Sequence, residues 1–327
     1  MKLSRSEAQG FLLLSSVVVI WVLSGFFIQN LFASHYNHPV AMTVFSVGLC
    51  ALLLCVPRSW REGAEYEKKN VLGRSLISDV QNDEISLPIS TRQVFTLGLV
   101  WIAGQLSYNV SLKFMSVSSS TAVSSMSSIF TFGFSWIFLE GYRATVYSVV
   151  AILLSTIGIF VIAYSQPAGA GVEESPVGFF IAGLSCCCYG LFTTLLKKWN
   201  TNRPASVTTL FGSFGVVALC VGIPLVGLAH QTRFDEFEFP SKSAVFGMSL
   251  NAVIGSVVSD ILLAKSVLLL NPITVSLGLS LTMPVSMFVD SVVLQAHSFK
   301  AAYAVGVVLQ FASVYCISVD NHRQHRL

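Results

Sequence analysis

The sequence predicts an all-α integral membrane protein with ten transmembrane helices, arranged as two inverted five-helix repeats. Three observations predict it: the composition, ten apolar segments of spanning length, and a weak internal similarity at a fixed offset. Hydrophobic residues make up 54% of the 327 residues and charged residues 11%. A typical soluble domain carries about 25% charged residues. The composition therefore excludes soluble and disordered proteins, and a dispersed net charge of +3 excludes a nucleic-acid partner.

Ten segments have the length and composition of membrane-spanning helices, which need about 20 mainly apolar residues. They are 10–32, 38–57, 93–114, 117–139, 144–164, 177–196, 207–229, 243–266, 272–294 and 299–319. None shows the two-residue alternation of a membrane β-barrel. We therefore expect each segment to be a helix.

Basic residues are unequally distributed between the two sides that these segments define. Fourteen of the nineteen Lys and Arg residues lie on the side of the two termini, and four lie on the opposite side. By the positive-inside rule, this predicts cytosolic N- and C-termini. The hydrophilic loop 58–92 lies on the same side, and we expect it to be partly disordered.

The two halves of the chain, 1–165 and 166–327, show a weak internal repeat. Between residues 112 and 149, an offset of 156 residues gives seven identities without a gap, including Ser124 with Ser280. Each half has five predicted spans, and five is an odd number, so the halves must insert with opposite orientations. Inverted repeats in membrane proteins place a substrate site near the membrane midplane. The pattern therefore indicates a transporter.

Five motifs in the spans and loops resemble those of a known transporter family. They are Ser124–Thr131, Tyr189–Phe192 before Lys197 and Lys198, Phe237–Pro240, Ile254–Asp260, and Leu281–Pro284 with Asp290. The first two resemble the drug/metabolite transporter superfamily, which includes EamA-like carriers. The other three are more particular and resemble solute carrier family 35, subfamily F, with its fifth member and fungal vacuolar relatives nearest. The resemblance implies an alternating-access carrier of an endomembrane, in which spans 1–4 and 6–9 surround the cavity.

Hydroxyl side chains are concentrated in the fourth predicted span, where nine Ser and Thr residues fall within thirteen positions. Ser120, Ser124 and Ser128 share one helical face because they are four residues apart. Polar groups inside a membrane usually face a cavity or another helix. This face therefore either lines the pathway or packs closely through its small side chains.

Three other spans carry candidate cavity residues. Gln105 lies on one stripe of the third span with Tyr108 or Asn109, where hydrogen bonding between helices is the alternative role. Trp21 and Tyr189 occupy equivalent places in the two halves. They could stack on a planar solute or pack in an aromatic core.

The ninth span supplies the remaining cavity and gating candidates. Repeat symmetry places Ser280 opposite Ser124, and the resembled motif adds Thr282 to the cavity. Pro284 should kink the helix and free backbone carbonyls toward the cavity. Asp290 is expected near the non-cytosolic end of the span, where it is either a dimer contact or a luminal gate.

Asp260 is a carboxylate in an otherwise apolar part of the eighth span. Three roles are open: a proton carrier, a site for a cationic solute, or a structural ion pair. Lys265, the nearest basic residue along the span, is about 140° away around the helix and can reach the membrane surface instead. We expect Asp260 to line the cavity and to take part in coupling.

The function predicted from these features is secondary-active transport or exchange of a small polar metabolite, and no enzymatic activity. The alternative is a membrane scaffold or chaperone that transports nothing. The sequence shows no protease, phosphate-binding or nucleophile-elbow motif and no clustered Cys and His ligands, so we expect no cofactor and no metal. The expected partners are the solute, the lipid bilayer and a second copy of the chain.

The sequence also suggests where the carrier resides. Glu67–Leu72 is close to an acidic dileucine sorting signal, with Val71 in place of the first Leu. The alternative is that these are ordinary loop residues with no sorting role. We expect an endomembrane, with vacuole or lysosome ahead of Golgi.

Overall fold

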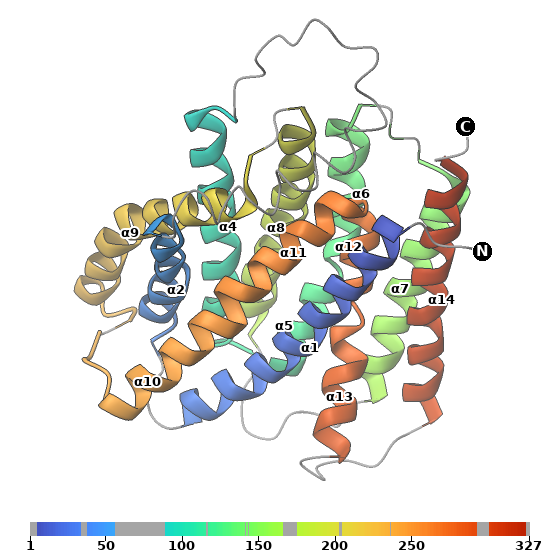
Figure 1. Ribbon diagram of the computed structural model, residues 1–327. Coiled ribbons are helices and arrows are strands. Elements are labelled where there is room, and N and C mark those ends of the chain that lie inside the picture. Colours follow the sequence, from blue (N-terminus) through green and yellow to red (C-terminus); the bar gives the residue numbers. More distant parts are fainter. Residues whose placement is uncertain are drawn as a thin grey trace, which may run out of the picture.

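The computed structural model describes residues 5–33, 38–55, 89–115, 117–140, 142, 144–165, 175–202, 205–235, 237–292 and 301–324. These residues form helices joined by short connections, and none of them lies in a β-strand (Figure 1). The predicted all-α class is confirmed for this part of the chain. Most of the predicted loop 58–92 lies outside it.

The helices follow one another closely along the chain. The first half contains α1 (Arg5–Ala33), α2 (Pro39–Gly48), the 3-10 helix η1 (Leu49–Cys55), α4 (Thr91–Ser111), α5 (Val117–Ser125), α6 (Ser127–Phe138) and α7 (Val146–Ser165). The second half contains α8 (Pro176–Asn202), α9 (Val207–Gln231), α10 (Lys242–Asn251), the π-helix η2 (Ala252–Val258), α11 (Ser259–Leu269), α12 (Pro272–Leu279), α13 (Thr282–Val292) and α14 (Ala301–Gln324).

Seven helices in the described part are long and apolar enough to cross a membrane, so the chain is a multi-pass membrane protein. They are Arg5–Ile28, Val146–Tyr164, Pro176–Thr201, Val207–Gln231, Ala244–Leu269, Pro272–Val289 and Ala301–Asp320.

The other three predicted spans are helical but differ from a long apolar helix. The second is the shorter apolar helix Pro39–Cys55. The third, α4, is 21 residues long but includes Gln105, Tyr108 and Asn109. The fourth is divided into α5 and α6 at Met126, where α5 is rich in serine. Length and composition therefore support the ten-span prediction only in part.

Helices α7 and α14 lie side by side at one edge of the bundle (Figure 1). Gly158 and Gly306 allow their close approach. A Cβ on Gly158 would lie 3.0 Å from the Gly306 carbonyl oxygen, and a Cβ on Gly306 would lie 2.9 Å from the Gly158 carbonyl oxygen. Small residues at such contacts are typical of helix pairs in membranes. We call α7 and α14 the support pair.

The remaining helices cross one another around the centre of the bundle. Helix α1 packs along α11, α4 packs along α8, and α9 packs against α2 and η1. The N-terminal end of α1 and the C-terminal end of α14 lie on the same side of this bundle (Figure 1). An even number of crossings would produce this arrangement.

Candidate functional site

Three polar side chains from three helices meet in the centre without hydrogen-bond partners. They are Trp101 of α4, Tyr189 of α8 and Asp260 of α11, and we call them the central cluster. Asp260 is 1% exposed, and both of its carboxylate oxygens are buried and unpaired. The Tyr189 hydroxyl and the Trp101 ring N–H are buried and unpaired as well. The Asp260 carboxylate acts electrostatically on the Tyr189 hydroxyl, and the Trp101 N–H lies near the carboxylate but outside hydrogen-bonding geometry.

The Trp101 ring is held in place by an aromatic core. Its centroid lies 4.5 Å from that of Phe192 and 5.9 Å from that of Phe211. Such tilted and edge-on pairs are the favourable aromatic arrangements. The sequence analysis missed Trp101, although it lies four residues before Gln105 and so continues the polar stripe of this helix.

Trp21 connects the two halves of the chain next to the central cluster. Its ring N–H donates to the Ser259 hydroxyl at 3.0 Å, and Ser259 precedes Asp260. One turn further along α1, the Ser24 hydroxyl donates to Asn251 at 2.6 Å. Neither Ser259 nor Asn251 was a sequence candidate. Both become visible only when α1 is placed along α10, η2 and α11.

The π-helix η2 lies directly before Ser259 and Asp260. Gly255 in this segment faces Ser24 and Asn251 so closely that an added Cβ would overlap both side chains. The wide helical turn and the glycine together admit the contact between α1 and the eighth span. π-helical turns inside α-helices are frequent at functional sites.

The candidates on α4 have mixed surroundings. Asn109 donates to the Thr43 hydroxyl at 2.8 Å and thereby joins α4 to α2. Tyr108 lies near the Thr121 hydroxyl of α5, and Gln105 is half-buried. The structure therefore gives Asn109 a helix–helix contact, which was the alternative role expected for it.

The serine face of the fourth span divides into paired and unpaired hydroxyls. Ser120 shares a hydrogen bond of 3.0 Å with Ser111 of α4. Ser124 and Ser128, on either side of the break at Met126, have buried hydroxyls without a partner among the described residues. Only this second part of the face has free hydrogen-bonding capacity.

The candidates on the ninth span stabilise its interruption between α12 and α13. Ser280 and Thr282 donate to the backbone carbonyls of Leu277 and Leu279 at 2.6 and 2.7 Å. Tyr303 of α14 donates to the Pro284 carbonyl at 2.8 Å. The carbonyl that Pro284 leaves without its helical donor, that of Ser280, accepts from the Met283 N–H at 3.3 Å.

Ser280 belongs to a buried network with the support pair. Its hydroxyl lies 2.6 Å from the Gln310 side-chain oxygen and 3.3 Å from the Ser155 hydroxyl. It is therefore not brought together with the central cluster. Asp290 lies in α13, and its side chain is outside the described part of the structure.

The ion pair expected as one role for Asp260 is absent among the described side chains. Lys265 is exposed on α11, and the ion pair found in the described part joins His38 to Asp235 at 2.7 Å. The described residues also contain no group of His, Cys, Asp or Glu side chains suited to a metal ion. Chemically, the central cluster offers two donors and one carboxylate to a proton or a polar ligand.

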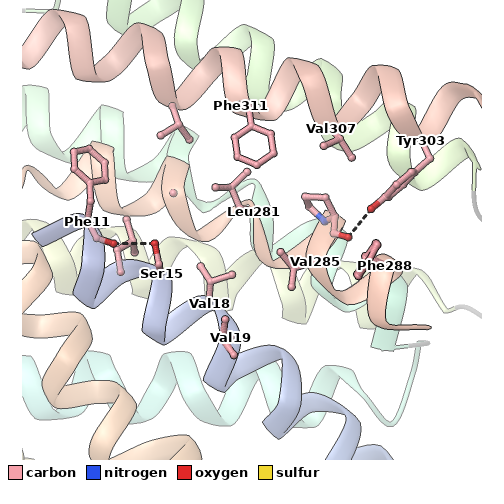
Figure 2. A pocket seen from close by; sticks show the side chains of 14 residues that line it. Phe11, Ser15, Val18, Val19, Leu281, Val285, Phe288, Tyr303, Val307 and Phe311 are labelled. Carbon is pink, nitrogen blue, oxygen red and sulfur yellow. Dashed lines mark hydrogen bonds between the residues drawn. The ribbon is translucent and has the colours of Figure 1, made fainter. Parts of the chain in front are cut away.

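An apolar groove of about 420 Å³ lies apart from the central cluster, between α1, α13 and α14 (Figure 2). Its polar side chains are bonded within the protein: Ser15 to the Phe11 carbonyl at 2.9 Å and Tyr303 to Pro284. The other lining side chains that Figure 2 labels are apolar. The groove has no free polar group with which to orient a polar solute.

Comparison with known proteins places the chain among transporter relatives. Residues 8–164 match the EamA-like transporter family. The chain is 27% identical to the thiamine-repressible mitochondrial transport protein of Saccharomyces cerevisiae, over 96% of this chain and 91% of that protein. It is 24% identical to an uncharacterized vacuolar membrane protein of the same yeast, over 97% and 91% of the two chains.

Solute carrier family 35 member F5 of Mus musculus is 26% identical over 70% of this chain and 44% of that protein. A solved crystal structure superposes with a TM-score of 0.66 at 13% identity, over 97% of this chain and 98% of the other. At that identity the likeness shows a shared fold. The predicted resemblance to EamA-like carriers and to solute carrier family 35, subfamily F, is confirmed.

Proposed function

We propose that the protein is a secondary-active transporter or exchanger of a small polar metabolite, working by alternating access. One observation carries the proposal: polar groups from both halves of the chain meet, unpaired, in the centre of the bundle. Trp101 comes from the first half, and Tyr189 and Asp260 come from the second. Buried polar groups in a stable structure normally have partners. Groups that lack one in the middle of a membrane are typical of a transport pathway.

We further propose ten spans in two inverted repeats, with α2 and η1, α5 and α6, α10 to α11, and α12 and α13 each forming one span. Two observations support this. The interruptions at Met126 and at Ser280–Leu281 lie within two residues of the 156-residue offset. The packing is also symmetric under exchange of the halves: α1 with α11 corresponds to α8 with α4.

The pathway that we propose is lined by the central cluster and by neighbouring side chains with spare hydrogen-bonding capacity or partial exposure. Trp21 borders it through Ser259, and Ser124 and Ser128 face it from the fourth span. Gln105 and Tyr108 complete it on α4. Asn109, Ser120, Ser280 and Thr282 serve the scaffold through the bonds described above, and Pro284 shapes the ninth span.

We place the carrier in an endomembrane, a vacuole or lysosome first, with both termini cytosolic. The vacuolar relative supports this location, whereas the mitochondrial relative would favour another one. A homodimer through Asp290 stays a proposal. Fluorescent tagging and protease protection in yeast cells would test the compartment and the side on which the termini lie.

A transport screen on the purified protein tests the function. Liposomes containing the protein would be offered defined mixtures of labelled amino acids, nucleotide sugars and B vitamins, with and without a pH gradient. We expect saturable uptake of one class, with empty liposomes as the control. If well-folded protein moves no solute while it stabilises a membrane partner in cells, it is a scaffold and the proposal fails.

A further inference from the structure

We infer that Asp260 carries the coupling proton, and that the structure described here is the proton-loaded state. The inference rests on the proposed transport function and adds the identity of the coupled ion.

Three aspartates are buried in the described part of the structure, and their surroundings differ. Asp235, 2% exposed, accepts from the Val40 N–H at 2.9 Å and contacts His38. Asp320, also 2% exposed, accepts from Thr145 and Ser148 at 2.7 and 2.6 Å. Only Asp260 among these three is unpaired.

An unpaired ionised carboxylate is costly in this position. Moving a carboxylate out of water costs several kcal/mol even after relaxation of the protein. The described part of the chain offers Asp260 no cation to compensate that cost. The compensating positive charge therefore comes from outside the described residues, and we assign it to a bound ion.

The space around the Asp260 carboxylate favours a proton over a larger cation. Both Asp260 oxygens are fully buried, so no room is left beside them for an organic cation. The same burial leaves no room for a metal ion beside the carboxylate, and the described residues offer no group of three or more His, Cys, Asp or Glu side chains to hold one. A proton occupies no volume. It converts the carboxylate into a neutral acid, which a buried site tolerates far better.

The groups around Asp260 are compatible with reversible protonation. The Asp260 carboxylate would act electrostatically on Tyr189 of α8 and Cys50 of η1, and both of these side chains are neutral when protonated. Helix α12 has no titratable residue. The titratable residues of α9, Cys220 and His230, are exposed, and Arg5 and Glu7 lie in the first turn of α1. The two lysines of α8 are engaged elsewhere: Lys197 donates to the Leu268 and Leu270 carbonyls at the C-terminal end of α11, and Lys198 lies over the Phe138 ring. Lys265 of α11 is exposed. Among the described residues, no fixed charge therefore contacts the Asp260 carboxylate.

Proton release follows from opening of the site to water. The O–H bond of the Asp260 acid breaks, its electron pair stays on the carboxylate oxygen, and the proton passes to a water molecule as hydronium. The ionised carboxylate can then accept hydrogen bonds from the Tyr189 hydroxyl and the Trp101 N–H. Bonds of this charge-assisted kind stabilise the ion. Solute binding and return of the proton from the other side complete the cycle.

Infrared spectroscopy on the purified protein in nanodiscs tests the protonation directly and requires no solute. A protonated carboxylic acid has a C=O stretching band that a carboxylate lacks, and the band shifts in D₂O. At neutral pH we expect this band in the wild type, its loss in Asp260→Asn, and its retention in Asp320→Asn. An identical spectrum for wild type and folded Asp260→Asn would overturn the inference, and thermal unfolding would confirm that each variant is folded.

Transport separates failure of this inference from failure of the proposed function. With the solute found in the liposome screen, one unit of pH gradient supports up to about tenfold accumulation for one proton per solute. We expect Asp260→Asn to lose this accumulation and Asp320→Asn to keep it. If the wild type exchanges the solute at a rate that does not depend on the pH gradient, only the inference about the proton is contradicted. No transport by the wild type would contradict the proposed function, whereas the infrared result would still decide the protonation.

Discussion

The support pair and the central cluster both contain buried polar side chains, but most of those in the support pair are hydrogen-bonded and those in the central cluster are not. In the support pair, Gln310 is bonded to Ser155 and Ser280, and Asp320 is bonded to Thr145 and Ser148. In the central cluster, Asp260 and its neighbours have no partner. Pairing of buried polar groups fixes one arrangement of helices. Unpaired groups leave the centre free to respond to a proton or a solute.

The contrast extends to the two interrupted spans. The Gln310 side chain accepts a hydrogen bond from Ser280 at the interruption of the ninth span. The equivalent residue in the first half is Leu154, whose side chain cannot form such a bond. Met126, at the other interruption, packs against an apolar group that includes Ile159, Ile162 and Met283. Ser313 of α14 is an exception within the support pair, since its buried hydroxyl is unpaired.

The largest expected effect comes from filling the two interruptions with a bulky side chain. Ser280→Trp should lower the free energy of unfolding by about 3 kcal/mol or more, because the site is fully buried and its network is lost. Ser124→Trp should fold and block transport, since Ser124 faces the proposed pathway. Thermal unfolding in detergent would measure the stability of both variants, and liposome uptake would measure their transport. An active and stable Ser280→Trp variant would contradict the difference drawn between Ser280 as a scaffold residue and Ser124 as a pathway residue.

The next effect concerns the hydrogen bonds that Gln310 forms with Ser155 and Ser280. Gln310→Leu keeps the bulk but leaves a carbonyl and two hydroxyls without their partner, which should cost about 1–3 kcal/mol. Thermal unfolding in detergent would measure it. Gln231→Leu, at an exposed position at the end of α9, is the matched control and should change stability by at most about 0.5 kcal/mol. Equal stability of the two variants would show that the hydrogen bonds of Gln310 do not stabilise the interruption in the ninth span.

A smaller difference should separate two aspartates. Asp320→Asn weakens the bonds from Thr145 and Ser148 and should destabilise by about 1–2 kcal/mol. Asp260→Asn replaces an unpaired acid by a neutral group of the same shape, so its stability should stay within about 0.5 kcal/mol of the wild type. The midpoints of chemical or thermal unfolding compare the two. A strongly destabilised Asp260→Asn would mean that the carboxylate has a structural partner.

The smallest effect on stability is expected at Tyr189. Tyr189→Phe removes a hydroxyl that is unpaired in this state, so unfolding should change by about 0.5 kcal/mol or less. Gradient-driven uptake should fall about tenfold, because the ionised Asp260 loses a hydrogen bond of about 1.5 kcal/mol. Initial uptake rates at a fixed gradient measure this loss. Unchanged uptake would exclude Tyr189 from the proton cycle.

The sequence was informative about the helices because hydropathy depends on local composition. It predicted α4 and the interrupted fourth span as simple spans, because spanning length and a mainly apolar composition do not show how polar residues or a break at Met126 alter the helix. It identified Asp260 and Tyr189, because charge and aromaticity inside a span are visible in one dimension. It could not assign Trp101 or Ser259, whose importance depends on which helices become neighbours.

The same limit explains the candidates that received scaffold partners. Ser280 and Ser124 are equivalent in the repeat, and the sequence alone treats them alike. Their difference arises from Gln310, a residue 30 positions away on α14 that reaches only one of them. Hydroxyl groups are interchangeable in a sequence pattern, but packing decides which of them stay unpaired.

Proton movement is the most direct test of the account, because it asks whether the unpaired carboxylate carries the coupled ion. Liposomes containing the protein and a trapped pH-sensitive dye would receive a gradient of the transported solute with no pH gradient. We predict a change of internal pH with wild-type protein and with Asp320→Asn, and none with Asp260→Asn. A pH change of the same size with Asp260→Asn would contradict the account.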